Sequence, residues 1–174
     1  AAALQDADLV FWTGHGLELF LEDSITTLAP HARIVELADA PGITLLPPRE
    51  GGAFEGHDHD GDGIPDEEGH EEPGHGDHVG HDHEEERDMH FFLDPDNAIL
   101  MVDAIETALT DLDPEDAATY ATNADATRAD LKALIAETTA ELAPIKGRPF
   151  VVFHDAYQYF ESRFGLSVAG SITV

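Results

Sequence analysis

The sequence predicts an α/β fold built on parallel β-sheets, and three features of the chain support this prediction. A strand, a helix and a second strand follow one another near the start of the chain, which is the pattern of a βαβ unit. An uninterrupted, alanine-rich helical segment crosses the second half of the chain. An apolar strand then ends directly on a histidine, at the position where strands of parallel sheets carry ligand groups.

The first unit contains two predicted strands and the helix between them. Residues 8–13 are a short apolar run ended by Gly14, and residues 33–37 are a second such run. Large apolar residues recur at helical spacing over residues 17–28, and Pro30 closes that segment. Because a helix connects the two strands, we expect them to pair in parallel.

The rest of the chain predicts a long loop, two helices and the start of a second sheet. The apolar pattern disappears over residues 48–88, so a flexible loop is expected there. Asp94-Pro95 begins a helix, and residues 114–143 form a longer one that would span roughly 40 Å and connect two lobes. We expect part of an N-terminal lobe at residues 1–113 and the start of a C-terminal lobe at residues 144–174. Both ends of the chain look like cuts through a larger protein, so both lobes are expected to be incomplete.

Composition excludes several classes of function. The formal net charge of −29 at pH 7 disfavours nucleic acids and anionic membranes as partners and favours cations. The chain contains no cysteine, which excludes thiolate zinc sites, disulfides and thiol catalysis. Apolar residues make up 42% of the chain, enough for a packed core. No apolar run reaches the roughly 18 residues of a membrane helix.

Most of the histidines lie among acids and glycines in the predicted loop. This composition predicts metal binding in preference to a merely solubilising charge run, because imidazole and carboxylate are zinc ligands. Ordering a loop costs conformational entropy, so its sites should be weaker and less selective than a preformed one. We expect the loop to capture zinc and pass it to a cleft. The predicted loop ligands are His57, His59, His70, His75, His78, His81 and His83.

The same loop contains a pattern typical of calcium sites. Asp58, Asp60, Asp62 and Asp66 stand at relative positions 1, 3, 5 and 9 of a calcium-binding loop, with a glycine at position 6. Position 12 is a glycine where a bidentate acid is expected, and no flanking helices are predicted. The loop therefore has two candidate metals, zinc through its histidines and calcium through these aspartates.

Two histidines outside the loop have apolar neighbours. His90 lies in the segment MHFFLDP, and His154 follows the apolar run 150–153; each precedes a predicted helix. Each has a purely structural alternative, but zinc sites collect ligands from separate elements, which favours a shared metal. His15 is expected at the surface or beside a site in preference to a ligand role, and His31 in a solvated turn.

Several segments together resemble a known family. They are residues 5–14 (QDADLVFWTG), the histidine-rich loop, residues 89–95 (MHFFLDP), and residues 153–160 (FHDAYQYF) with the following FGL at 164–166. In this order they resemble the solute-binding proteins of bacterial zinc-uptake ABC transporters. The resemblance covers nearly the whole chain.

The resemblance implies two Rossmann-like lobes with parallel sheets joined by a long, rigid helix. It implies that His90 from the first lobe and His154 from the second are zinc ligands. The family's earliest ligand histidine would lie before Asp8, outside this chain, and its C-terminal acidic position beyond Val174. The implied function is high-affinity capture of periplasmic zinc and its delivery to an ABC-transporter permease, without catalysis. A periplasmic zinc chaperone is a further expected partner, and the signal peptide is expected upstream.

Two alternative functions stay open at this point. A manganese- or iron-binding relative of the same fold would use more carboxylate ligands and lack the histidine loop, so the histidines favour zinc. A zinc-dependent hydrolase would need an open metal position and a general base, and the chain has no His-Glu-x-x-His motif. Because an incomplete lobe exposes strand edges, self-association of the chain is also expected.

Overall fold

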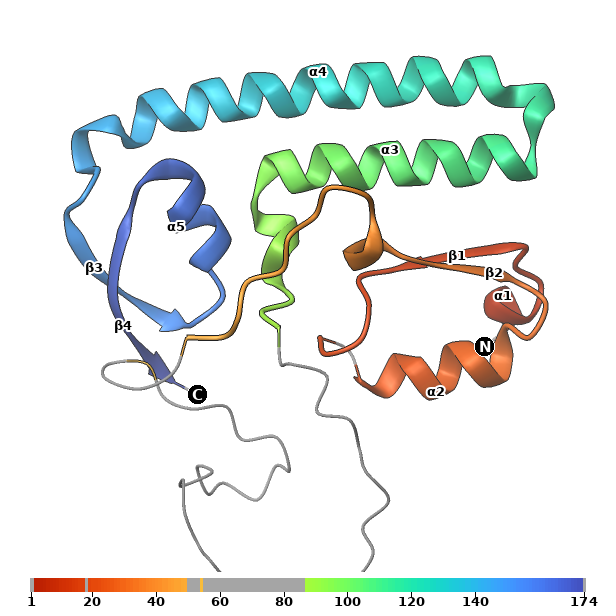
Figure 1. The fold of residues 1–174 in the computed structure, drawn as a ribbon, viewed down its shortest axis with the longest axis horizontal. Coiled ribbons are helices and arrows are strands. Elements are labelled where there is room, and N and C mark those ends of the chain that lie inside the picture. Colours follow the sequence, from red (N-terminus) through yellow and green to blue (C-terminus); the bar gives the residue numbers. More distant parts are fainter. Residues whose placement is uncertain (1, 18, 50–53, 55–86, 174) are drawn as a thin grey trace, which may run out of the picture.

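The computed structural model describes residues 2–17, 19–49, 54 and 87–173 (Figure 1). It has an N-terminal region (residues 2–49 and 87–112), a long helix and a C-terminal region (residues 143–173). The helices are α1 (Ala2–Gln5), α2 (Leu19–Leu28), α3 (Pro95–Leu112), α4 (Ala117–Leu142) and α5 (Gln158–Phe164); the strands are β1 (Leu9–Trp12), β2 (Arg33–Glu36), β3 (Pro149–His154) and β4 (Ser167–Thr173); the 3₁₀ turns are η1 (Leu37–Asp39), η2 (His90–Leu93), η3 (Pro114–Asp116) and η4 (Ala143–Ile145).

The sheet of the N-terminal region consists of β1 and β2. They pair in parallel, from Leu9 opposite Arg33 to Trp12 opposite Glu36. In Figure 1 this sheet lies between α2 on one side and α3 on the other. Because α2 makes the connection between the strands, β1–α2–β2 is a βαβ unit. The parallel sheet predicted from the sequence is confirmed.

Helix α3 begins where the sequence predicts. The Asp94 carboxylate accepts a hydrogen bond from the backbone N–H of Asp96 at 3.0 Å. Pro95 occupies the first helical turn, where the backbone N–H has no partner within the helix, so proline loses no hydrogen bond there. Arg163 of α5 donates from Nε to the same Asp94 carboxylate at 2.7 Å. The helix cap therefore also joins α3 to the C-terminal region.

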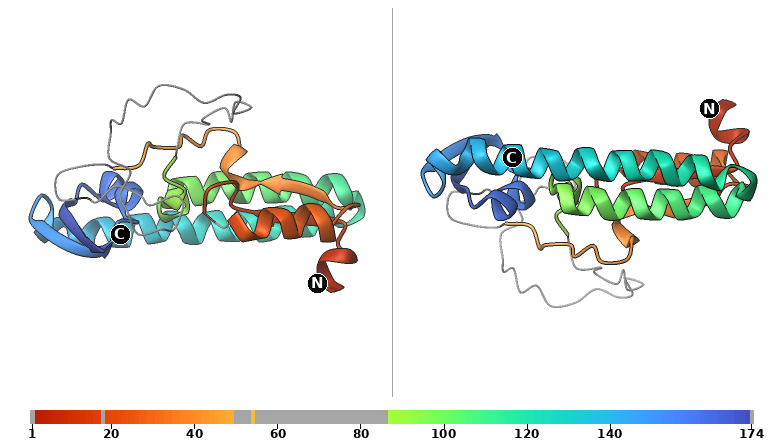
Figure 2. Two further views of the ribbon diagram at one scale, coloured as in Figure 1. Left: turned by 90° about the horizontal axis from the view of Figure 1, so that it is seen from below. Right: turned by 90° about the horizontal axis from the view of Figure 1, so that it is seen from above.

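Helix α4 has 26 residues and leads from the N-terminal to the C-terminal region. It runs beside α3 in both views of Figure 2, and Arg128 joins the two helices by binding Asp103 at 2.7 Å and Glu106. The sequence predicts one helix over residues 114–143, whereas the structure has 3₁₀ turns at both ends, each containing a proline that cannot donate an α-helical hydrogen bond. No helix in the described part of the chain, α4 included, combines the length and apolar character of a membrane span.

The C-terminal region repeats the strand–helix–strand pattern. Strands β3 and β4 pair in parallel, from Pro149 opposite Ser167 to His154 opposite Thr173, and α5 connects them. The β3 side chains of Val151 and Phe153 remain 57% and 70% exposed. With two parallel sheets joined by a long helix, the predicted α/β class is confirmed.

An apolar core connects the two regions. Its buried members are Leu37, Met89, Phe91 and Tyr159, and Phe91 is 0% exposed. Since Tyr159 belongs to α5, the C-terminal region packs into the same core as the β1–β2 sheet. Burying one large apolar side chain contributes about 1.5–3 kcal/mol, so this core fixes how the regions meet.

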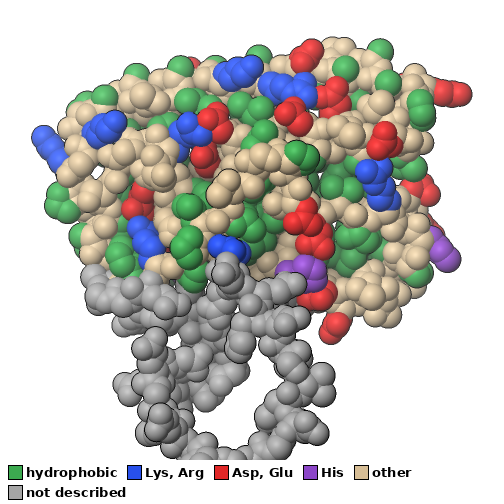
Figure 3. Space-filling view, viewed as in Figure 1, with side chains coloured by type: hydrophobic (Ala, Val, Ile, Leu, Met, Phe, Trp, Pro, Cys, Tyr) green, Lys and Arg blue, Asp and Glu red, His purple; other side chains and the backbone are tan. Residues whose placement is uncertain are grey.

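The face shown in Figure 3 carries carboxylates and Lys or Arg side chains scattered among neutral and hydrophobic ones. The whole chain has 37 acidic against 8 basic residues. Such an excess of acidic residues attracts cations to the molecule.

Candidate metal centre

The two histidines predicted as metal ligands lie side by side where the two regions meet. The ring centroids of His90 and His154 are 5.6 Å apart, and the ring planes make an angle of 71°. His90 opens η2, and His154 is the last residue of β3. Both line a cavity of about 280 Å³. The fold therefore brings together the pair that the sequence singles out, while their role as zinc ligands stays a prediction.

Packing around His90 fixes its position. Its neighbours Met89 and Phe91 are 6% and 0% exposed. The buried amide of Asn97 donates from Nδ2 to the Phe91 carbonyl at 2.9 Å and so holds η2 against α3. The turn after β1 comes close because Gly16 has a φ of +104°, and a Cβ there would lie 3.1 Å from Met89 Cγ. The backbone at His90 is therefore held on both sides.

Asp88 orients the His90 ring. Its Oδ1 accepts a hydrogen bond from the His90 backbone N–H at 2.9 Å and lies 2.8 Å from His90 Nδ1. A carboxylate only accepts, so Nδ1 carries the hydrogen and the lone pair of Nε2 is left for a metal. Carboxylate–histidine–metal arrangements of this kind are the usual support of zinc ligands. The sequence prediction missed Asp88, although an acid two residues before a candidate ligand was a usable signal.

Fewer contacts hold His154 in place than hold His90. The backbone of His154 ends β3, and its carbonyl accepts a hydrogen bond from the Ala156 N–H at 3.1 Å. The residue is exposed, and within the described part of the chain its ring makes no hydrogen bond. The position predicted for it, at the carboxyl end of a parallel strand, is confirmed. Among the described residues, the ring of His154 packs against the ring of His90.

The chain segments that flank the histidine-rich loop meet beside this pair. Leu46 and Asp88 form an isolated antiparallel bridge, in which the Asp88 N–H donates to the Leu46 carbonyl at 2.8 Å. The Tyr159 hydroxyl accepts from the Leu46 N–H at 2.6 Å and donates to the Asp88 carbonyl at 2.7 Å. Burial raises the pKa of this phenol above its ordinary value, so it stays a donor. Residues 48, 49, 54, 87 and 88 of the expected loop at 48–88 are thus among the described residues.

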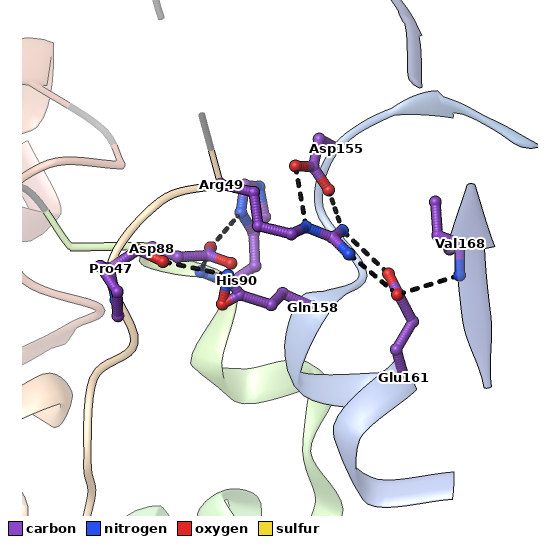
Figure 4. Close-up of polar contacts among 8 residues, drawn as sticks. All are labelled: Pro47, Arg49, Asp88, His90, Asp155, Gln158, Glu161 and Val168. Atoms are coloured by element: carbon purple, nitrogen blue, oxygen red, sulfur yellow. Dashed lines mark hydrogen bonds and ion pairs between the residues drawn. The ribbon is translucent and has the colours of Figure 1, made fainter. Parts of the chain in front are cut away.

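Arg49, Asp155 and Glu161 form a second polar cluster beside the histidines (Figure 4). The Arg49 guanidinium binds both carboxylates at once. Burial by itself lowers the pKa of Arg49, but the hydrogen bonds that Arg49 donates to Glu161 and Asp155 outweigh burial and raise its pKa. Arg49 and Asp155 line the same cavity as His90 and His154. The sequence prediction gave no role to any member of this cluster.

The other predicted site residues lie elsewhere. His15 is half-exposed in the turn after β1, with Nδ1 3.1 Å from Glu22 and Nε2 3.3 Å from Glu36. His31 is exposed in the turn before β2. Within the described residues, no group of three or more His, Cys, Asp or Glu side chains is placed to hold a metal ion. The loop histidines (His57, His59, His70, His75, His78, His81, His83) and the calcium candidates (Asp58, Asp60, Asp62, Asp66) lie outside the described residues.

The chain is similar to known proteins over its whole length. A family model described as zinc-uptake complex component A, periplasmic (ZnuA), matches residues 1–174. The high-affinity zinc uptake system protein ZnuA of Brucella abortus is 49% identical over 188 residues, covering 100% of this chain and 55% of the relative. The protein of the same name from Haemophilus ducreyi is 36% identical and covers 98% of this chain and 53% of the relative. The chain thus spans about half the length of the curated relatives that it matches.

Solved structures share the fold. The crystal structure of a ZnuA deletion mutant with zinc bound has a TM-score of 0.71 to this chain at 22% identity, covering 99% of this chain and 54% of that one. The AdcAII protein of Streptococcus pneumoniae has a TM-score of 0.65, also at 22% identity, covering 99% and 52%. These likenesses show a common α/β architecture.

Proposed function

Because the chain belongs to the family of periplasmic zinc-uptake components A, we propose that the protein captures zinc with high affinity in the periplasm and delivers it to an ABC-transporter permease. The observation that carries this proposal is the pairing of His90 and His154, 5.6 Å apart between ring centroids and contributed by different regions. A metal held between them would connect the two regions. Zinc is the cargo of this site, so no chemical step follows its binding.

The donor atoms support zinc over its alternatives. His90 offers Nε2 because Asp88 binds its Nδ1, and His154 supplies a second imidazole. Imidazole nitrogen suits zinc, whereas manganese prefers oxygen donors, so a manganese-binding role is disfavoured. The relatives are named for zinc, and calcium in the loop has no support from them.

The proposed organisation has two lobes around this pair. Residues 1–113 belong to the N-terminal lobe and carry the loop at 48–88, residues 114–143 connect, and residues 144–174 begin the C-terminal lobe. The shared core and the Arg163–Asp94 contact support small motions at the junction, so release of zinc needs only a slight separation of His90 from His154. The loop histidines act as a collecting segment that supplies this pair.

The test uses the protein at its full natural length, with zinc affinity measured by competition against a chromophoric chelator. His90→Ala and His154→Ala should each lower the affinity by more than the 10–100-fold that typically follows loss of an outer-shell partner. His31→Ala, at an exposed histidine, is the matched control and should bind as the native protein does. Native affinity in both site variants would refute the proposal.

Two further measurements separate the finer roles. The number of zinc ions bound by the protein with the loop and by a variant without it tests whether the loop binds zinc. An equal number in both proteins would show that the loop holds none. Incubation with ester and peptide substrates tests the absence of catalysis. Zinc-dependent turnover above background would place the protein among the hydrolases instead.

A further inference from the structure

We propose that Arg49 sets the metal preference of the site by withholding the Asp155 carboxylate from the metal. The inference rests on the proposed zinc-binding role of His90 and His154. Asp155 follows a candidate ligand directly and lines the same cavity, yet in its present position it completes no group of three His, Cys, Asp or Glu side chains among the described residues. Arg49 holds the Asp155 carboxylate in an ion pair, so that this carboxylate does not coordinate the metal.

The geometry of the cluster shows how completely the carboxylate is engaged. Arg49 Nε donates to Asp155 Oδ2 at 3.1 Å, and Nη2 binds Oδ1 of the same residue. The other side of the guanidinium binds Glu161, with Nη1 and Nη2 each 2.9 Å from a carboxylate oxygen. Figure 4 shows the arginine between the two acids. Both oxygens of Asp155 therefore have a charged donor, in the bidentate geometry that makes such pairs strong.

Burial keeps this pairing in place. The side chains of Arg49, Asp155 and Glu161 are 21%, 14% and 9% exposed. Glu161 Oε2 also accepts the Val168 N–H at 3.3 Å, and the ring of Phe54 lies 4.4 Å from the guanidinium carbon. Hydrogen bonds between charged groups are strong in such a buried setting, and losing one partner of the pair leaves an uncompensated charge. Asp155 is therefore not free to turn toward a metal while Arg49 is present.

The consequence concerns which metal the cavity prefers. With Asp155 engaged, the site offers imidazole nitrogens, which suit zinc. Without Arg49, the carboxylates of Asp155 and Glu161 lose the cation that they share, and Asp155, which lines the cavity, can bind a metal cation instead. A carboxylate donor favours harder ions such as manganese and raises the coordination number. Arg49 is thus a positioning residue that acts through Asp155.

The experiment measures Zn²⁺ and Mn²⁺ affinities of the full-length protein by competition. We expect Arg49→Ala to raise Mn²⁺ affinity relative to Zn²⁺ by about tenfold, within the range seen for outer-shell changes. The visible absorption of the Co²⁺-loaded variant should weaken, because a higher coordination number reduces the intensity of its bands. Arg49→Ala combined with Asp155→Asn should restore the native preference, since the released carboxylate is then absent.

A matched control removes the same charge elsewhere. Arg128 also binds carboxylates, among them those of Asp103 and Glu106, but it does not line the cavity. Arg128→Ala should leave the ratio of Mn²⁺ to Zn²⁺ affinities within about twofold of native; a larger shift in this variant would mean that loss of positive charge, and not release of Asp155, changes the ratio. If Arg49→Ala does not fold, the same affinities are measured in Arg49→Lys. It keeps the charge but cannot bind both acids bidentately, and it should shift the ratio in the same direction.

The outcomes distinguish the two proposals. A native protein that binds no zinc overturns the proposed function. A native protein that binds zinc, with an unchanged metal ratio in Arg49→Ala and in Arg49→Lys, overturns the role of Arg49 alone. A shifted ratio that Asp155→Asn does not reverse shows that Asp155 is not the released donor, and also overturns the inference.

Discussion

The two histidines share one cavity but are supported very differently by the regions that carry them. His90 is bound by Asp88 and flanked by Met89 and Phe91, both deep in the shared core. His154 ends a strand whose neighbouring Phe153 is 70% exposed, and its ring makes no hydrogen bond within the described residues. One half of the site is therefore preorganised by packing, and the other is positioned mainly by its backbone. We expect zinc to order the C-terminal half more than the N-terminal half.

The largest expected effect comes from comparing one phenylalanine from each region, Phe91 in the core and Phe153 at the surface. Phe91→Ala removes a fully buried side chain and should lower the free energy of unfolding by about 3–5 kcal/mol. Phe153→Ala removes an exposed one and should change it by roughly 0.5 kcal/mol or less. Denaturant unfolding of the full-length protein measures both. Similar losses in the two variants would mean that the C-terminal half is as tightly packed as the N-terminal half.

The second prediction concerns the orientation of His90. Asp88→Asn weakens the bond to Nδ1, and zinc affinity should fall by about 10–100-fold, the usual result of losing such a partner. Asp39→Asn, at an exposed aspartate of η1, is the control and should have no such effect. The affinities can be compared in one chelator competition series. An Asp88→Asn variant with native affinity would show that His90 needs no carboxylate support.

The third prediction tests the contact between α5 and the N-terminal region. Tyr159→Phe leaves the Leu46 N–H without its acceptor, so the free energy of unfolding should fall by about 1–3 kcal/mol. Amide exchange at Leu46 and Asp88 should accelerate, as NMR would show. Tyr157→Phe changes a tyrosine that is 44% exposed and provides the comparison. Unchanged exchange at both amides would show that Tyr159 does not help to hold the backbone beside His90.

The smallest expected effect is a loss of stability at alkaline pH that depends on Tyr159. Because burial raises the pKa of Tyr159 above its ordinary 10.0, the folded state holds the phenolic proton more tightly than the unfolded state. The corresponding stability is complete below the unfolded pKa and is lost as the pH rises through the folded pKa. Unfolding free energies of the native protein and Tyr159→Phe should therefore converge with increasing pH in this range. Parallel curves would contradict the shift.

Local patterns were sufficient to predict most of the fold. The β1–α2–β2 unit followed from hydrophobic spacing, the start of α3 from Asp94-Pro95, and the place of His154 from the apolar run before it. Each of these depends on residues close together in the sequence. The same holds for His90, whose apolar neighbours distinguish it from the loop histidines.

The supporting contacts could not be predicted in the same way. Arg49 lies more than 100 positions from its partners Asp155 and Glu161, and no periodicity connects residues so far apart. Tyr159 reaches Leu46 across a similar separation. Arg49 also stood in a segment whose composition predicts disorder, so composition concealed its role. Such pairs are selected by the packing of the two regions, which only the assembled fold reveals.

The bridge between Leu46 and Asp88 has a practical consequence for engineering. It fixes the two points where the histidine-rich stretch leaves and re-enters the fold, so a change in the length of that stretch is not transmitted to the histidine pair. Loop closure is tolerant of such changes, since doubling a loop costs only about 0.6 kcal/mol. The stretch between residues 54 and 87 is thus a position at which a further domain could be inserted without disturbing the histidine pair.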